Sequence, residues 1–447
     1  MNKTYIKAGI FRVLQRGIIV FFGFLGFIVL IGLLSKEEYG TWVLFILVSN
    51  ILEAAKKGFI QNGLMKFLLE CNEENRGNIQ SNSLVLNFIL SLPIILLLIF
   101  FAKYLSLFWD APHLESLLYI YIPISLFLSF FLHLEIIQNS YLLFKNIFIA
   151  YIVRNGFFLA TILFFYFTNY KISLVLLAYS QLFAILIATI ISYFLNRKII
   201  IWGTLKWNTL KQLFHYGKFT FGANLSSILF KNIDQILLPT FLSPVAVAIY
   251  NPAIRITNLV EVPTITVASI FFPESVRRMK EEGSNVIKQL FEKSIGLLLL
   301  IMLPIVVFIF ILAKPIILLI ASDKYLATIP VLQILIFYAL FLPFLRQFGQ
   351  LLDSINKPHI NFRFVVISII INLSINLLLI PLYGVTGAAI GTLSAYIITF
   401  LINFWYLQKK YYISIVMIFK NSWYYLKQLI WYVKSHNIFT EYKNAEK

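Results

Sequence analysis

The sequence predicts an all-α membrane protein with twelve transmembrane helices, and three observations support this fold class. Hydrophobic residues make up 60% of the 447 residues and charged residues only 13%, which is more apolar surface than a soluble domain can hide. The apolar residues gather into twelve stretches, each long enough to cross a hydrocarbon core ~30 Å thick, which takes about 20 residues. Lys and Arg concentrate in alternate gaps between these stretches. Together these features are typical of a polytopic helical membrane protein.

The expected spans follow from the apolar runs and from the charged or Pro- and Gly-containing breaks between them. They are 12–34, 41–62, 82–102, 114–138, 147–168, 173–195, 217–242, 246–275, 290–312, 326–352, 360–381 and 384–407. The second is the most polar, since it contains Glu53, Lys56 and Lys57. The gaps are short, and none has room for a separate soluble domain.

The basic residues give the orientation through the positive-inside rule. They cluster at the N-terminus, after each even-numbered span and after the last span, whereas the other gaps hold isolated lysines. Both termini are therefore expected to be cytoplasmic. The net charge of +18 follows largely from the same bias. Because this charge is spread over one membrane face, it suits anionic lipids and indicates no nucleic-acid partner.

The spans divide into two six-helix lobes, residues 1–195 and 217–408, joined by a basic cytoplasmic linker at 196–216. A short internal repeat supports this division. Leu-Ser at 34–35 and at 242–243 is followed in both copies by a small residue five positions after the Ser and an aromatic residue two later. Such repeats are common in transporters whose halves move against each other.

The pattern changes in the last segment, residues 409–447. Lys420, Lys427 and Lys434 recur every seven residues and share one helical face, with Trp and Tyr nearby. We expect a C-terminal amphipathic helix in the cytoplasmic interface, followed by a tail at 436–447. A partner-binding helix is the alternative.

Polar side chains inside the spans are the candidate functional residues, because ionisable groups are costly in a membrane. The candidate substrate-binding residues are Arg154, Lys231, Arg255, Arg346, Asn224, Asn251, Asn258 and Gln350. The candidates for coupling to protons or Na⁺ are the carboxylates of Glu53, Asp234 and Glu261.

Two interpretations of these charges stay open. In the first they form structural ion pairs, Asp234 with Arg255 and Glu135 with Arg154, since a buried charge needs a partner. In the second they line a water-filled cationic cavity for an anionic substrate, because guanidinium and ammonium groups suit phosphate oxygens.

Motifs of soluble catalysis do not occur in the sequence. There is no G-x-x-x-x-G-K-[ST], no H-E-x-x-H and no G-x-S-x-G. The five His residues lack metal-ligand spacing, and the single Cys, Cys71, permits no disulfide. We therefore expect no enzymatic activity, no cofactor and no metal centre.

Two segments resemble the polysaccharide flippases, of O-antigen (Wzx-like) type, in the MATE-related exporter superfamily. The first is DQILL at 234–238 with LSP at 242–244 and IYN at 249–251. The second is IPLYGVTGAAIGT at 380–392, a Pro-Gly turn followed by small residues that allow close helix packing. The chain departs from the family at 245–248, VAVA, where an acidic residue and a Gly are common.

The resemblance implies a MATE-like fold and alternating access, without ATP hydrolysis. It implies a flippase that moves an undecaprenyl-diphosphate-linked glycan to the outer leaflet of a bacterial inner membrane. Membrane lipids and other polysaccharide-assembly proteins are the further expected partners. Two rivals stay open, a cation-coupled multidrug exporter of the same superfamily and a polytopic glycan polymerase or ligase.

Overall fold

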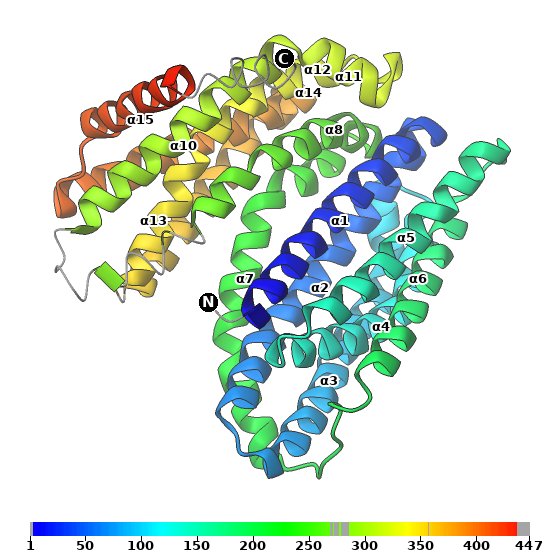
Figure 1. Ribbon diagram of the computed structural model, residues 1–447. Coiled ribbons are helices and arrows are strands. Elements are labelled where there is room, and N and C mark those ends of the chain that lie inside the picture. Colours follow the sequence, from blue (N-terminus) through cyan, green and yellow to red (C-terminus); the bar gives the residue numbers. More distant parts are fainter. Residues whose placement is uncertain (1–2, 269–270, 272–276, 279–285, 356, 436–447) are drawn as a thin grey trace, which may run out of the picture. The chain divides into compact units, whose positions relative to one another are not determined.

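The computed structural model describes residues 3–268, 271, 277–278, 286–355 and 357–435, without the side chains of 3–8, 219–220, 223–224 and 432–435. Within these ranges the regular elements are all helices (Figure 1). They form two compact units, Met1–Ile249 and Tyr250–Lys447. The all-α class predicted from the sequence is confirmed.

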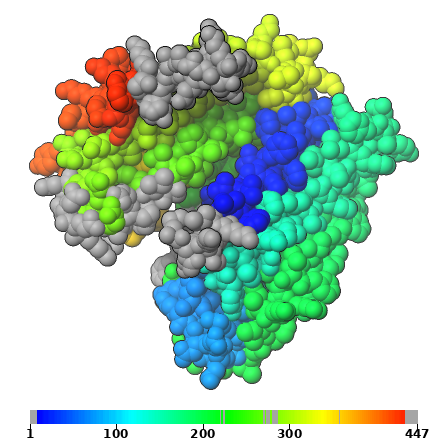
Figure 2. All heavy atoms as spheres, viewed as in Figure 1, coloured from blue at the N-terminus to red at the C-terminus, as the bar shows by residue number. Residues whose placement is uncertain are grey.

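The first unit contains seven long helices and the start of an eighth. They are α1 (Lys3–Leu33), α2 (Lys36–Glu70), α3 (Glu73–Phe108), α4 (Leu114–Ser140), α5 (Phe144–Thr168), α6 (Leu174–Asn196), α7 (Trp207–Phe241) and α8 (Pro244–Val260). The helix α2 packs along α7 and against α3 and α4, while α1 packs along α5. In the space-filling view the side chains of α1 (dark blue) and α5 (teal) make a continuous surface (Figure 2).

The second unit begins within α8, at Tyr250, and contains the helices that follow. These are α10 (Val286–Ile311), α11 (Ala313–Ala321), the 3₁₀ turn η1 (Asp323–Tyr325), α12 (Thr328–Leu335), the 3₁₀ turn η2 (Ile336–Leu340), α13 (Leu342–Ser354), α14 (Pro358–Tyr411) and α15 (Ile415–Ser435). Their core is rich in aromatic side chains, and the ring of Phe400 contacts that of Phe344, with centroids 4.7 Å apart.

Local sequence signals place several helix boundaries. Ser35 caps α2 in a capping box: its hydroxyl accepts from the Glu38 amide (3.1 Å), and its own amide donates to the Glu38 carboxylate (2.9 Å). Gly384 breaks α14 into two helices, because its φ of 60° lies in the left-handed region. Beyond this break, Gly387 packs so closely that an added Cβ would lie 2.1 Å from the Leu379 carbonyl oxygen. The turn and the close packing predicted from residues 380–392 are both present.

Eight helices are long and apolar enough to cross a membrane among the residues described. One of them is α14, which accounts for two of the expected spans because of its break at Gly384. The helices α2, α7 and α8 coincide with three more expected spans, but α2 and α7 are more polar and α8 ends at Val260. Part of the expected span at 246–275 lies outside the described residues.

Several helix boundaries differ from the predictions; α1 and α3, for example, begin at Lys3 and Glu73 instead of 12 and 82. The helix α7 begins at Trp207 instead of 217, because Leu213 is buried against Gly63 of α2. The span at 326–352 is divided into α12, η2 and α13, and Pro343 stands at the start of α13, where a proline is tolerated. A short helix, α11, occupies part of what was expected to be an outer loop.

The segment expected to link two lobes is fastened to the first unit. Backbone amides of Ile201 and Lys206 donate to the side chains of Gln80 (3.0 Å) and Asn82 (2.9 Å) at the start of α3. The two compact units therefore divide inside α8, at residues 249 and 250, and not within 196–216. The arrangement as six-helix lobes, 1–195 and 217–408, stays a prediction.

The C-terminal helix predicted after residue 410 is present as α15, which packs along α10. Gly296 is a point of close approach, since a Cβ there would lie 2.9 Å from the Ile418 carbonyl oxygen. The Ser414 amide also donates to Glu292 Oε1 of α10 (2.8 Å). The expected tail, 436–447, lies outside the described residues.

Candidate functional site

A buried lysine stands among uncharged oxygens in the first unit. Lys56 of α2 is 4% exposed, and its ammonium donates to Ser91 Oγ of α3 (3.2 Å) and to the Ser125 carbonyl oxygen of α4 (3.0 Å). It also donates to Ser129 Oγ of α4. These three acceptors match the three N–H donors of a lysine ammonium, and they join α2 to both neighbouring helices.

A set of ionisable side chains from α2, α4 and α5 lies in the same unit. Tyr151 donates from its hydroxyl to Glu135 Oε2 (2.9 Å) and interacts through space with Glu53 and Arg154. The guanidinium of Arg154 lies over the Phe131 ring, 5.6 Å from its centroid. In place of the Glu135–Arg154 ion pair of the first interpretation, Glu135 has a carboxylate–hydroxyl bond and Arg154 a cation–π contact.

In the second unit a carboxylate neutralises a cation directly. Arg346 of α13 forms an ion pair with Glu261, at 3.8 Å between Nη2 and Oε2, and the Glu261 side chain is only 7% exposed. On α8, Arg255 donates from Nε to Asn251 Oδ1 (2.9 Å), as their spacing of four residues allows. The structure thus brings together two pairs of sequence-predicted site residues.

The remaining candidates take varied positions. Lys231 on α7 and Asn258 on α8 are exposed, whereas Gln350 on α13 and Glu53 on α2 are half-buried. Asp234 on α7 is buried, and its Oδ1 accepts from the Gln235 amide (2.9 Å). Asn224 lies on α7, but its side chain is outside the described part. Their roles in binding or coupling stay predictions.

The residues that sequence reasoning missed are the partners of Lys56. Serines at positions 91, 125 and 129 are ordinary in membrane helices, and one acceptor is a backbone carbonyl that no sequence pattern marks. Because Ser125 contributes its carbonyl oxygen and not its hydroxyl, only Ser91 and Ser129 could have been sought from their side chains. Within the described residues no group of three or more His, Cys, Asp or Glu side chains is arranged to hold a metal ion.

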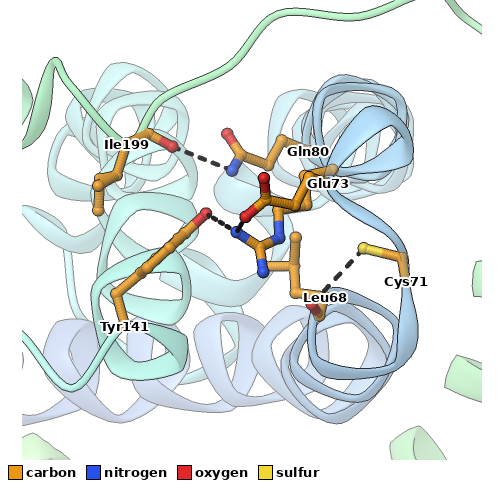
Figure 3. A network of polar contacts seen from close by, with 7 residues as sticks. Leu68, Cys71, Glu73, Gln80, Tyr141 and Ile199 are labelled. Atoms are coloured by element: carbon orange, nitrogen blue, oxygen red, sulfur yellow. Dashed lines mark hydrogen bonds and ion pairs between the residues drawn. The ribbon is translucent and has the colours of Figure 1, made fainter.

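A second polar network lies at the N-terminal end of α3, which begins at Glu73 (Figure 3). Gln80 Nε2 donates to the Ile199 carbonyl oxygen (3.2 Å), and Arg76 contacts both Glu73 and the Tyr141 hydroxyl, each at 3.4 Å. Cys71 is a free thiol that donates to the Leu68 carbonyl oxygen (3.5 Å). This network joins α2, α3, α4 and the segment after α6.

The chain belongs to the family described as polysaccharide biosynthesis protein, which matches residues 29–330. Over 201 residues, 45% of this chain, it is 31% identical to the uncharacterized membrane protein MJ1068 of Methanocaldococcus jannaschii. Over 212 residues, 44% of this chain, it is 24% identical to the probable low-salt glycan biosynthesis flippase Agl15 of Haloferax volcanii. The matched segments span 40% and 42% of these relatives' own lengths.

Solved structures share the fold over nearly the whole chain. The lipid II flippase MurJ, in an inward closed conformation, has a TM-score of 0.73 at 17% identity and covers 96% of this chain and 93% of its own. A multidrug-resistance MATE family transporter in an inward-facing conformation has a TM-score of 0.71 at 16% identity, covering 87% and 94%. The fold is therefore the MATE-like, all-helical fold that these membrane proteins share. MurJ and the Haloferax volcanii relative are named as flippases and the MATE protein as a transporter, in agreement with the expectation that the chain is not an enzyme.

Proposed function

We propose that this protein is a flippase for a polyprenyl-diphosphate-linked oligosaccharide, which it moves from the cytoplasmic to the outer leaflet by alternating access. The observation that carries the proposal is the combination of family and fold. The family is one of polysaccharide biosynthesis, and the fold matches MurJ, a lipid II flippase, over 96% of the chain. The relative from Haloferax volcanii, named as a glycan biosynthesis flippase, supports the same substrate class.

The proposed recognition of substrate rests on four cations, Arg154, Lys231, Arg255 and Arg346. A diphosphate offers several anionic oxygens, which suit the fork of a guanidinium better than the single carboxylate that now faces Arg346. At 3.8 Å the Arg346–Glu261 pair is longer than an ordinary charge-assisted hydrogen bond, so that a phosphate can compete with Glu261 for it. The amides of Asn224, Asn251, Asn258 and Gln350 would then bind sugar hydroxyls.

The proposed motion is a rocking of the two halves with α8 as the flexible element. The division between the compact units falls at residues 249 and 250, directly before Asn251 and Pro252 of α8. A proline within a helix removes a backbone donor and favours a bend at that point. Glu53, Asp234 and Glu261 stay the proposed carboxylates for ion coupling.

The proposed location is the cytoplasmic membrane, with both termini on the cytoplasmic side. The bias of Lys and Arg supports this orientation. Two further points stay predictions, that the membrane is a bacterial inner membrane and that the glycan is an O-antigen. Neither follows from the two relatives named above, because both are archaeal. Membrane lipids and other polysaccharide-assembly proteins are the proposed partners.

The test is a leaflet-exchange assay with the purified chain in liposomes. The probe is fluorescent undecaprenyl-diphosphate-linked N-acetylglucosamine, and a membrane-impermeant quencher reports how much of it faces outward. We expect exchange with the wild-type chain and slower exchange when Arg154, Lys231, Arg255 or Arg346 is singly replaced by Ala. Lys103→Ala, at an exposed lysine of a predicted outer gap, is the matched control.

Three results would count against parts of this proposal. Absence of exchange by the wild-type chain would reject the flippase. Full exchange by all four Ala variants would reject the cationic recognition of the diphosphate. Susceptibility of a deletion strain to cationic drugs, with glycan export intact, would favour the multidrug exporter.

A further inference from the structure

Lys56 has no part in the substrate recognition proposed above. It is nevertheless a charged residue in a membrane helix that needs an explanation, since it is more deeply buried than Arg154, Lys231, Arg255 or Arg346. Its ammonium sits among two serine hydroxyls and one main-chain carbonyl, at the junction of α2, α3 and α4. Sets of oxygen lone pairs of this kind, with carbonyls among them, bind Na⁺ and H⁺ in the membrane segments of transporters. Here a side-chain ammonium takes the position of such an ion.

Buried polar side chains continue from this site along the interface of α3 and α4. The two helices run antiparallel, because Ser91 meets Ser129 (3.3 Å) while Arg76 meets Tyr141 at the other end. Asn87, one turn from Ser91, donates to the Ser129 carbonyl oxygen (3.0 Å). The same register places Ser83 level with His133, and both are buried, at 0% and 3% exposed. Beyond them Gln138 donates to Ser192 of α6 (2.6 Å).

Several atoms of this polar row have no hydrogen-bond partner. They are Ser83 Oγ, Asn87 Oδ1, His133 Nδ1 and Gln138 Oε1. A buried polar atom without a partner costs about 1–3 kcal/mol, and ordered water is its usual partner in proteins. The row ends near Gln80, which is bonded to the backbone of the segment after α6 at Ile199 and Ile201 (Figure 3). By the positive-inside rule that segment is cytoplasmic.

We propose that Lys56, with Ser91, Ser125 and Ser129, is a proton-binding site that couples transport to the proton gradient, and that the polar row along α3 and α4 leads protons to it. This inference rests on the proposed function, since it names the proton as the coupling ion and adds Lys56 to the three carboxylates proposed above for coupling.

The chemical step is the release of one proton from the ammonium. An N–H bond breaks, its electron pair stays on nitrogen, and the proton passes to water in the polar row. The neutral amine has two donors instead of three and no charge, so one of the bonds from α2 to α3 or α4 is lost. Ser91 and Ser129 keep their own bonds to Asn87 O (2.9 Å) and Ser125 O (2.6 Å), so the two serine hydroxyls stay satisfied. Deprotonation therefore loosens α2 without disrupting α3 or α4.

Ionisable groups lie on every helix that packs against α2. Glu53, one turn earlier on α2, is the charge that acts on Lys56 through space. Lys57 is the neighbouring cation on α2 itself. The ionisable groups of the packed helices include Arg12 and Arg16 of α1, Glu73, Glu74, Arg76 and Lys103 of α3, Glu115, Tyr121, His133 and Glu135 of α4, and Lys211, His215, Lys218, Lys231 and Asp234 of α7. His133 belongs to the polar row and is the group best placed to relay a proton.

The test uses the full chain in liposomes with the same fluorescent undecaprenyl-diphosphate probe and an imposed pH gradient. When one probe molecule moves in exchange for one proton, the pH gradient shifts the distribution of the wild-type probe toward the leaflet on the acidic side by up to about tenfold per pH unit. We expect no such shift with Lys56→Met. Lys57→Met, the neighbouring half-buried lysine, is the matched control and should respond like the wild-type chain.

Lys56→Arg separates coupling from structure. Arginine keeps the positive charge but does not release its proton in proteins. If Lys56 is only a structural charge, Arg restores the gradient response; if Lys56 couples, Arg abolishes it. Thermal melting in detergent verifies that each variant is folded.

The inference is overturned if folded Lys56→Met or Lys56→Arg responds like the wild-type chain. It is also overturned if exchange by the wild-type chain does not respond to the pH gradient. The same holds if exchange depends on Na⁺, that is, if it stops when choline replaces Na⁺ in the buffer. A wild-type chain that moves no probe at all is a different result, because that rejects the flippase itself.

Discussion

The two units of the molecule hold a cation in opposite ways, buried Lys56 in the first and half-buried Arg346 in the second. In the first, Lys56 is hydrogen-bonded to hydroxyl and carbonyl oxygens, and the carboxylate of Glu53 acts on it only through space. In the second, Arg346 faces the carboxylate of Glu261, and the pair is close to neutral. An ammonium among neutral oxygens can lose its proton and leave an uncharged site. An arginine beside a carboxylate keeps its charge and yields it only to another anion.

This difference suggests a division of labour between the units. The first unit is suited to bind and release a proton, whereas the second is suited to exchange an internal carboxylate for a substrate phosphate. The following variants test whether the two cations differ as this comparison requires.

The largest effect is expected from Arg346→Ala. It leaves the buried Glu261 carboxylate without the guanidinium that neutralises it, which costs about 3 kcal/mol for a buried pair. Unfolding of the purified protein in detergent measures the loss of stability. The double variant Arg346→Ala/Glu261→Gln should recover most of it. Equal stability of the single variant and the wild-type chain would show that the pair is solvated.

A smaller effect is expected from Lys56→Met. The serine hydroxyls keep acceptors on their own helices, so the unfolding free energy should fall by less than about 1 kcal/mol. The same unfolding experiment compares it directly with Arg346→Ala. A loss as large as that of Arg346→Ala would mean that the ammonium is a structural clamp, and the two units would then not differ in this respect.

The smallest effect is expected at an exposed ion pair, whose loss gives the reference value for the Arg346 and Lys56 variants. Lys66 and Glu70 lie 4.0 Å apart with side chains 45% and 61% exposed. Exposed pairs on a helix contribute about 0.3–0.5 kcal/mol, so Glu70→Gln should shift the unfolding free energy by no more than this. The shift should vanish in 1 M salt, because salt screens exposed charges.

Much of the fold could be predicted because lipid imposes length and hydropathy on each span. Gly384 and the small residues after it marked the break in α14 and its close packing, since few other residues adopt a positive φ. The linker was harder to predict. Its basic residues indicated a cytoplasmic segment, but nothing in them showed that Gln80 and Asn82 bind its backbone. Such bonds form only after the chain has folded.

The candidate site was predictable in its residue types and not in its pairings. Arg346 and Glu261 were recognised separately, because each is a costly charge in an apolar span, but 84 residues separate them and no spacing rule connects them. Glu135 and Arg154 were paired on charge alone. The structure instead gives Glu135 the Tyr151 hydroxyl and gives Arg154 the Phe131 ring, both neutral partners.

Gly40 fixes the first residues of α8 to the start of α2. A Cβ at position 40 would lie 2.0 Å from the Pro244 carbonyl oxygen, so the two backbones touch where both copies of the Leu-Ser repeat occur. The opening turn of α8 is thus carried by the first unit, while Tyr250 and all that follows belong to the second. The helix α8 therefore begins in the first unit and ends in the second. If α8 is rigid, the distance between spin labels at Val245 and Asn258 stays constant. If α8 bends at Pro252, that distance changes.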